Sequence, residues 1–144
     1  MESYNDYFFP KEATLNFKRP NKNNLVIYEL WVYDYTTKRS FPGLMERLDY
    51  IQKLGVNAIE LMPVCEFEGQ ISWGYNPTHY FAPDKAYGNS EMYKQLIDEC
   101  HKRGMAVIMD MVFNHCSYHN VLFQDVVKNG RKSKYYDWFY IDGD

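Results

Sequence analysis

Three side chains that could take part in catalysis or binding follow a short apolar run late in the chain. They are Asp110, Asn114 and His115. The run itself, residues 105–109, is too short for a helix and lacks strict alternation, which is typical of a parallel strand covered on both faces. Parallel α/β proteins bind ligands at the carboxyl ends of their strands. A carboxylate, an amide and an imidazole there predict one wall of an active site. An Asp that caps a loop and an Asn-His pair that begins one remain the structural alternative.

Composition narrows the class of ligand. The chain holds 14 Tyr, 9 Phe and 3 Trp, which suits stacking on flat polar ligands such as sugars, although aromatic residues also fill cores and interfaces. Its 16 basic and 19 acidic residues give a net charge of −3 without a basic block. We therefore expect neither nucleic acid nor an anionic membrane surface as a partner.

The cysteines and the N-terminus indicate the compartment. Cys65, Cys100 and Cys116 are far apart and lack CxxC spacing, so neither a zinc site nor a disulfide framework is predicted. Residues 1–10 contain no basic segment followed by an apolar run, and no stretch approaches the roughly 18 apolar residues of a membrane span. We expect a cytoplasmic protein with reduced thiols.

The elements that must position the three side chains repeat in a strand-helix-strand order. Residues 1–24 are polar and aromatic and read as a linker. Leu25–Tyr35, centred on residues 26–33, is rich in β-branched and aromatic residues and predicts a first strand. Leucine and isoleucine at helical spacing predict a helix over Pro42–Leu54, and Val56–Met62 predicts the second strand. This is the pattern of a right-handed βαβ unit.

A second unit follows through a long loop. The stretch Val64–Gly88 is rich in Gly, Pro and aromatic residues, and loops of that length are usually functional. A helix over Ser90–Arg103 and a third strand over Met105–Met111 are predicted next, with a short helix near Asn120–Lys128. A (β/α) barrel needs eight such units in about 250 residues, so 144 residues predict a partial barrel and a truncated chain. No glycine-rich phosphate loop follows any predicted strand.

Four segments together resemble the catalytic barrel of the α-amylase family, glycoside hydrolase family 13. They are IYELWVYDYT at 27–36, GVNAIELMPV at 55–64, WGYNPTHYFAPDKAYG at 73–88 and DMVFNH at 110–115. Their order and spacing match the family as well as their spelling does. The resemblance implies that residues 25–144 are the N-terminal part of an α/β (β/α)8 TIM barrel, with its first three parallel strands and their helices.

The resemblance also implies roles for single residues. Asp110 matches the aspartate that supports the catalytic centre, and His115 the histidine that hydrogen-bonds the sugar at the cleaved linkage. Tyr75 matches the tyrosine that stacks on that sugar. Asn114 matches a position that in many members ligates a structural calcium ion through its amide oxygen. No other cofactor is implied. Trp73 and His79 are further candidates for sugar contact, with packing of the loop as the alternative.

Two departures bear on the subfamily. Asn76 stands where many starch-hydrolysing members carry aspartate, and Trp31 where many carry histidine. The string WGYNPTHYFAP is more similar to members that act at or near α-1,6 branch points, such as branching and debranching enzymes. The subfamily stays open between α-1,4 and α-1,6 specificity.

The catalytic acids of the family have no match here. Retaining glycosidases need two carboxylates about 5 Å apart, and the family adds a third. In the family they follow later strands, and Asp84, Glu66, Glu68 and Asp125 match none of them. Residues 134–144 resemble the start of the excursion called domain B. The resemblance thus implies a fragment that supplies the substrate-binding wall of a retaining α-glucan hydrolase or transglycosylase and is inactive without the remainder of its barrel.

Two other classes are open at this point. One is a non-catalytic carbohydrate-binding or regulatory module that keeps a barrel-like surface. The other is an unrelated α/β enzyme, which a doubly wound sheet would indicate.

Overall fold

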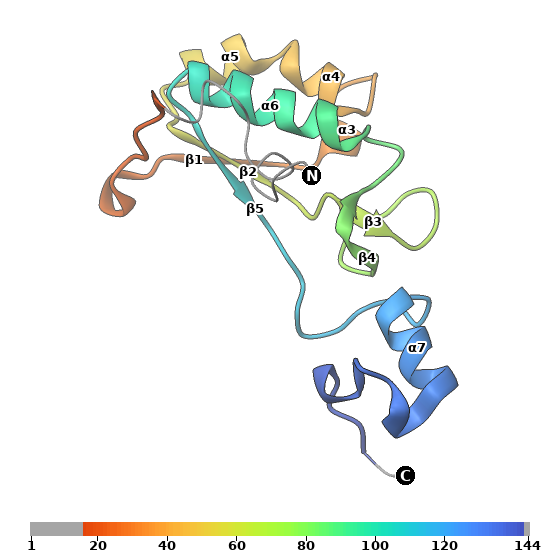
Figure 1. Cartoon of the computed structure of the whole chain (residues 1–144). Coiled ribbons are helices and arrows are strands. Elements are labelled where there is room, and N and C mark those ends of the chain that lie inside the picture. The colour runs from red at the N-terminus through yellow and green to blue at the C-terminus, as the bar shows by residue number, and fades with distance from the viewer. Residues whose placement is uncertain (1–15, 143–144) are drawn as a thin grey trace, which may run out of the picture.

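A parallel three-stranded sheet lies at the centre of the structure, a computed structural model that describes residues 16–142. The strands are β1 (Ile27–Leu30), β2 (Ala58–Leu61) and β5 (Ala106–Met109), in the order β1-β2-β5 (Figure 1). Both neighbouring pairs are parallel over four residues, so their carboxyl ends meet at one edge of the sheet. The prediction of three parallel strands adjacent in chain order is confirmed. The third strand is shorter than the predicted stretch 105–111.

One layer of helices covers one face of this sheet. Figure 1 shows α4 (Phe41–Met45), α5 (Leu48–Lys53) and α6 (Ser90–Lys102) on the same side. Apolar side chains from the helices and strands form a single core, and each stabilises the fold by roughly 1.5–3 kcal/mol when fully buried. Its members from these elements are Leu30, Phe41, Leu44, Leu48, Ile51, Ile59, Leu61, Leu96 and Cys100. The fold is thus an α/β partial barrel.

The opposite face of the sheet carries no helix of the described chain (Figure 1). Side chains alternate along a strand, and Leu30 and Leu61 point into the helix-covered core. Glu29 and Glu60, which are register partners, therefore point to the uncovered face. Two carboxylates thus lie side by side on that face.

The predicted loop Val64–Gly88 contains an antiparallel hairpin of β3 (Cys65–Phe67) and β4 (Pro77–Pro83). Asp84 is 1% exposed and holds the base of this hairpin, because its carboxylate accepts from the N–H of Phe67 at 3.3 Å and of Ala86 at 2.8 Å. Burial raises the pKa of Asp84 above its usual value. Proline at both ends of β4 and the shortness of β3 hide the hairpin in the sequence.

Beyond the sheet, an extended stretch leads to α7 (Val121–Asn129) and two 3-10 turns, Gly130–Lys132 and Tyr136–Trp138, which lie apart from the helix layer (Figure 1). Buried Asn120 caps α7, since its side-chain oxygen accepts from two backbone N–H groups of the first turn. Its amide also donates to the carbonyl of Pro77 at 3.2 Å. The predicted helix is confirmed to within one residue, and this cap joins it to the hairpin.

The first predicted strand, Leu25–Tyr35, is wrong in its second half. The strand ends at Leu30, and Val32–Tyr35 forms a short helix, α3. Two of its backbone N–H groups donate to the carbonyl of Trp31 at 3.1 and 3.2 Å. Val32 is 1% exposed, so packing in the core overrides the β propensity of its side chain.

The predicted helix Pro42–Leu54 is also wrong in its continuity, because α4 and α5 are separate. Arg47 lies between them with φ −107° and ψ 0°, and its N–H donates to the carbonyl of Leu44 at 2.9 Å, three residues back. Leu44 and Leu48 are both buried on either side of the break. Both pieces contribute buried side chains to the core on either side of the break.

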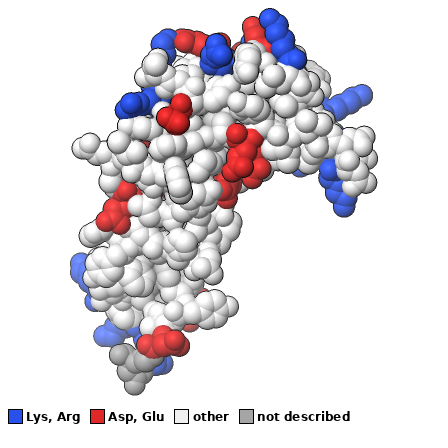
Figure 2. Space-filling model, turned by 180° about the vertical axis from the view of Figure 1, so that it is seen from behind, with Lys and Arg blue, Asp and Glu red and all other residues white. Residues whose placement is uncertain are grey.

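Residues 1–15 of the predicted N-terminal linker, 1–24, lie outside the described residues. Lys22–Asn24 forms a 3-10 turn before β1. Within residues 16–142, every helix is too short or too polar to cross a bilayer. Figure 2 shows one face of the molecule, on which Lys and Arg lie at the margins and form no broad basic patch.

Candidate functional site

Tyr75 and Asp110 meet at the carboxyl end of the parallel sheet. Asp110 directly follows β5, and its backbone N–H extends the sheet by donating to the carbonyl of Leu61 at 3.0 Å. The phenol of Tyr75, in the loop between β3 and β4, donates to Asp110 Oδ2 at 2.8 Å. This hydrogen bond, together with burial and nearby carboxylates, raises the pKa of Tyr75 to about 12. The ring is thereby held as a neutral phenol at the strand end.

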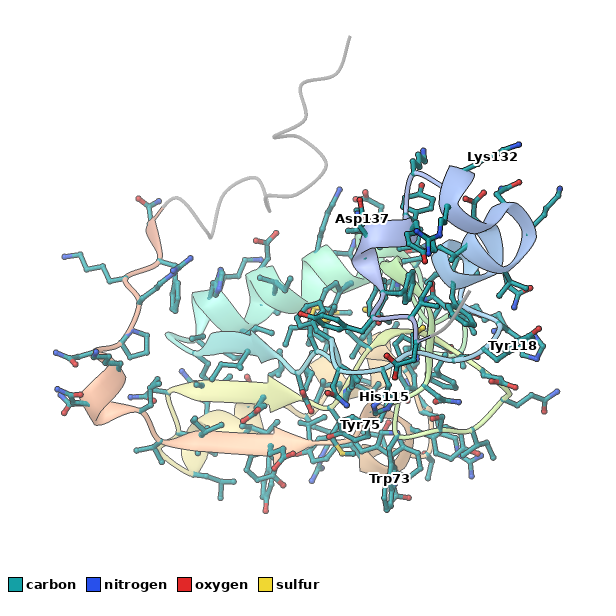
Figure 3. All side chains as sticks on the ribbon, turned by 90° about the horizontal axis from the view of Figure 1, so that it is seen from below. Trp73, Tyr75, His115, Tyr118, Lys132 and Asp137 are labelled. Atoms are coloured by element: carbon teal, nitrogen blue, oxygen red, sulfur yellow. The ribbon has the colours of Figure 1, made fainter. Side chains whose placement is uncertain are left out.

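His115 joins the same group from the segment after β5. Its Nε2 lies 2.8 Å from the backbone carbonyl of Tyr75 (Figure 3). A carbonyl oxygen only accepts, so we assign the imidazole hydrogen to Nε2 on chemical grounds. The neutral ring then has Nδ1 available as an acceptor. Because the ring is exposed, Nδ1 can meet a ligand. The structure thus brings Tyr75, Asp110 and His115 together at the carboxyl end of the sheet.

The loop that carries Tyr75 is pressed against the end of β2. Gly74 has φ +92°, a conformation that L side chains rarely adopt, and a Cβ placed there would lie 2.3 Å from the carbonyl oxygen of Pro63. Glycine is therefore required at this position for the loop to approach the strand end so closely.

Sequence reasoning missed two carboxylates near this group. Glu29 and Glu60, on the uncovered face of the sheet, both contribute to the raised pKa of Tyr75 after the larger effects of Asp110 and burial. They lie within strands rather than at the strand ends, where parallel sheets usually carry their ligand-binding residues. Alternation along the two predicted strands, combined with a parallel register, would have placed them on one face.

Trp73 and His79 do not join the group. Trp73 is 62% exposed and meets Trp31 edge to face at 6.5 Å, and Figure 3 shows its side chain directed away from Tyr75 and His115. His79, on β4, is exposed and its Nδ1 lies 3.1 Å from the hydroxyl of Thr78.

An apolar groove of about 880 Å³ opens beside His115. Phe81, Phe113 and Tyr140, all strongly exposed, line it, and Asn114 lies at the same groove. Among residues 16–142, no group of three or more His, Cys, Asp or Glu side chains could hold a metal ion. One exposed amide supplies a single oxygen, whereas Ca²⁺ takes six to eight. The described residues alone do not fit a calcium ion at Asn114.

The other acids named from the sequence have structural partners. Asp84 holds the hairpin, and Glu66 forms an ion pair with Lys85. Glu68 accepts from the hydroxyl of Ser117 at 2.6 Å, and Asp125 accepts from that of Ser133 at 2.5 Å. The three cysteines are free. Burial raises the pKa of Cys65 to about 11 and of Cys100 to about 12, so these thiols are protonated at neutral pH.

Comparison with known proteins gives consistent matches. Residues 36–144 match the family model "Alpha amylase, catalytic domain". The chain is 44% identical over 99 residues to a cyclomaltodextrinase of Thermoanaerobacter pseudethanolicus. The aligned stretch covers 69% of this chain and 17% of that protein. It is 41% identical over 99 residues to an intracellular maltogenic amylase of Bacillus subtilis, with 69% and 16% coverage.

Among solved structures, the trehalose-6-phosphate hydrolase of Bacillus licheniformis superposes with a TM-score of 0.71 at 33% identity, covering 81% of this chain and 21% of that one. The chain therefore spans about a fifth or less of the length of these relatives.

Proposed function

The chain belongs to the α-amylase catalytic-domain family, and from that premise we propose that it forms the sugar-binding wall of a retaining α-glucan hydrolase or transglycosylase. The observation that carries the proposal is the group at the carboxyl end of the sheet. Tyr75 donates to Asp110 at 2.8 Å, and His115 lies 2.8 Å from the Tyr75 carbonyl. Tyr75 is 35 residues from Asp110 and 40 residues from His115 in sequence, and these hydrogen bonds hold the two segments in one surface.

Each residue of this surface has a distinct task in the proposal. The ring of Tyr75 offers a flat apolar face to the C–H groups of a pyranose, and Asp110 fixes the ring through its hydroxyl. His115 orients the sugar through Nδ1, which accepts from a hydroxyl when the ring is neutral and donates when it is protonated. Fixed partners of this kind accelerate a reaction by holding the reacting centre in place.

In this proposal, the carboxylates that break the glycosidic bond come from another part of the barrel. A retaining mechanism needs a nucleophile and an acid/base about 5 Å apart, whereas Asp84, Glu66, Glu68 and Asp125 are engaged in structural contacts. We propose that residues 25–144 pack against the remainder of the same barrel, which supplies these groups, and that residues 1–24 are a linker. A calcium ion at Asn114 would need further oxygen ligands from that remainder.

The substrate class proposed is an α-glucan with α-1,4 or α-1,6 linkages. The loop string WGYNPTHYFAP favours members that act near branch points, whereas the relatives include a cyclomaltodextrinase and a maltogenic amylase. Trp73, exposed within the Tyr75 loop, is proposed as a contact for a more distant sugar. A cytoplasmic location is proposed from the intracellular Bacillus subtilis relative.

The test uses the natural gene product and a soluble α-glucan. Replacing His115 by Ala removes the oriented imidazole, and we expect kcat to fall by roughly 10- to 1000-fold, the range found for positioned polar groups. Tyr75→Ala should lower kcat/KM similarly because the stacking surface is lost, whereas Tyr75→Phe keeps the ring and should cost less than about tenfold.

Cys116→Ser, one residue beyond His115, is the control and should stay within about twofold of wild type. The proposal would be wrong if His115→Ala also stayed within twofold. A wild-type protein that binds maltotetraose in calorimetry but never cleaves or transfers it would instead support the non-catalytic binding module.

A further inference from the structure

We propose that Trp31 and Ser72 are positioning residues that hold the Tyr75 loop in its sugar-binding conformation. This inference rests on the proposed function. Both residues lie outside the group of Tyr75, Asp110 and His115.

The two departures from the family pattern, Trp31 and Asn76, both hydrogen-bond to Ser72 and therefore belong to one network.

Trp31 ties the end of β1 to the loop. Its indole N–H lies 3.0 Å from the backbone carbonyl of Ser72 and 3.0 Å from the hydroxyl of Tyr87. Tyr87 is fully buried between the rings of Phe41 and Phe67, so it gives the indole a rigid support. The indole also stacks on the ring of Tyr33 at 5.1 Å and meets the ring of Trp73 edge to face at 6.5 Å. Trp31 therefore has one fixed orientation toward the loop.

Ser72 extends this tie through the loop. Its hydroxyl accepts from the N–H of Gly74 at 3.0 Å and donates to Asn76 Oδ1 at 2.5 Å. These two partners lie on either side of Tyr75 in the sequence. Ser72 thus holds the backbone N–H before the stacking residue and the side chain of the residue after it, while its own carbonyl accepts from Trp31.

Asn76 fits this network better than an aspartate would. Its Oδ1 accepts from Ser72, and its Nδ2 donates to the carbonyl of Glu68 at 3.1 Å. An aspartate could accept from Ser72, but its second oxygen would face the Glu68 carbonyl, where two acceptors repel each other. The amide is therefore matched to both of its neighbours.

The consequence is a continuous set of contacts from β1 to β5. The order runs from Trp31 through Ser72 and its partners to Tyr75, and from Tyr75 to Asp110. Side chains that support the residues in contact with a ligand determine how well those residues are oriented. Since a shift of about 1 Å can cost on the order of 100-fold in rate, loss of this support should be visible in kinetics.

The experiment is a double-mutant cycle in the natural gene product. Trp31→Phe keeps an aromatic ring and removes the N–H donor, and we expect kcat/KM on a soluble α-glucan to fall about tenfold. If Trp31 acts through Tyr75, the same change made in a Tyr75→Ala protein should cost less than about twofold. Equal losses in both backgrounds would overturn the proposal.

Serine variants provide a second and independent arm. Ser72→Ala should lower kcat/KM about tenfold, and Ser72→Thr, which keeps the hydroxyl, should recover to within about threefold of wild type. The matched control is Ser133→Ala, because Ser133 also donates to one side chain and accepts from one backbone N–H, but far from the site. Its kcat/KM should stay within twofold. A Ser72→Ala protein that behaves like Ser133→Ala would contradict the role of Ser72.

Hydrogen exchange separates this proposal from the proposed function. In Trp31→Phe the amide of Gly74 should exchange at least about tenfold faster, while the amides of the β3–β4 hairpin keep their wild-type rates. That result supports the positioning role even if the protein never cleaves α-glucan. The absence of cleavage would contradict the proposed function alone. Unchanged exchange at Gly74 would contradict the positioning role alone.

Discussion

The substitution Gly74→Ala tests how closely the Tyr75 loop must approach the strand end. A methyl group at residue 74 would lie 2.3 Å from the carbonyl oxygen of Pro63 and 2.7 Å from its Cβ, and neither atom belongs to a flexible side chain end. The left-handed conformation adds about 1–2 kcal/mol for an L residue, and overpacking adds about 1–3 kcal/mol. We expect the free energy of unfolding to fall by roughly 2–5 kcal/mol.

Gly69→Ala is the matched control, because Gly69 has φ +90° but no atom within 4 Å of the added Cβ. It should lose only the conformational part, about 1–2 kcal/mol. The assay is urea unfolding followed by tryptophan fluorescence, which reports on this region because Trp73 lies in the loop and Trp31 contacts it. Equal losses of stability in the two variants would refute the reasoning, since they would show that the contact with Pro63 imposes no cost.

Three further predictions concern contacts around the site. Tyr75→Phe should cost most stability below pH 10. The folded pKa of Tyr75, about 12, lies above its ordinary value of 10.0, so the stabilisation by Asp110 is lost as pH rises through 12, and urea unfolding of the two proteins should converge there. Asn120→Ala removes the cap of α7 and should lower the free energy of unfolding by about 1–2 kcal/mol, measured by circular dichroism against urea. Glu68→Gln weakens the bond from Ser117 and should cost about 1 kcal/mol or less in the same assay, because Glu68 is half exposed.

The parallel sheet could be predicted from sequence because its signals are local. Short apolar runs alternate with helical periodicity, and the crossover rule then fixes strand order. The two errors in this region have different causes. At Val32, burial in the core overrides the β propensity of the side chain. At Arg47, the chain turns with a hydrogen bond to Leu44 three residues back, which the spacing of the apolar residues does not record.

The site was predictable only in part for a related reason. Chain topology brings Tyr75 and His115 to one edge of the sheet, and that much follows from the order of the elements. Side-chain direction within a loop does not, because it depends on backbone angles such as that of Gly74. Trp73, two residues from Tyr75, therefore points elsewhere, and the role of Trp31 is visible only once its partners are located.

The strand order β1-β2-β5 also determines the order in which this part of the protein can fold during synthesis. Ile27 pairs with Ala58, and Ala58 with Ala106, so each new strand adds beside the one made before it. Contacts between segments that are near in sequence close small loops and form quickly. At the usual synthesis rate of about 5–20 residues per second, β5 leaves the ribosome roughly 2–10 s after β2. The first βα unit therefore has time to condense before the loop that carries Tyr75 meets its partner Asp110.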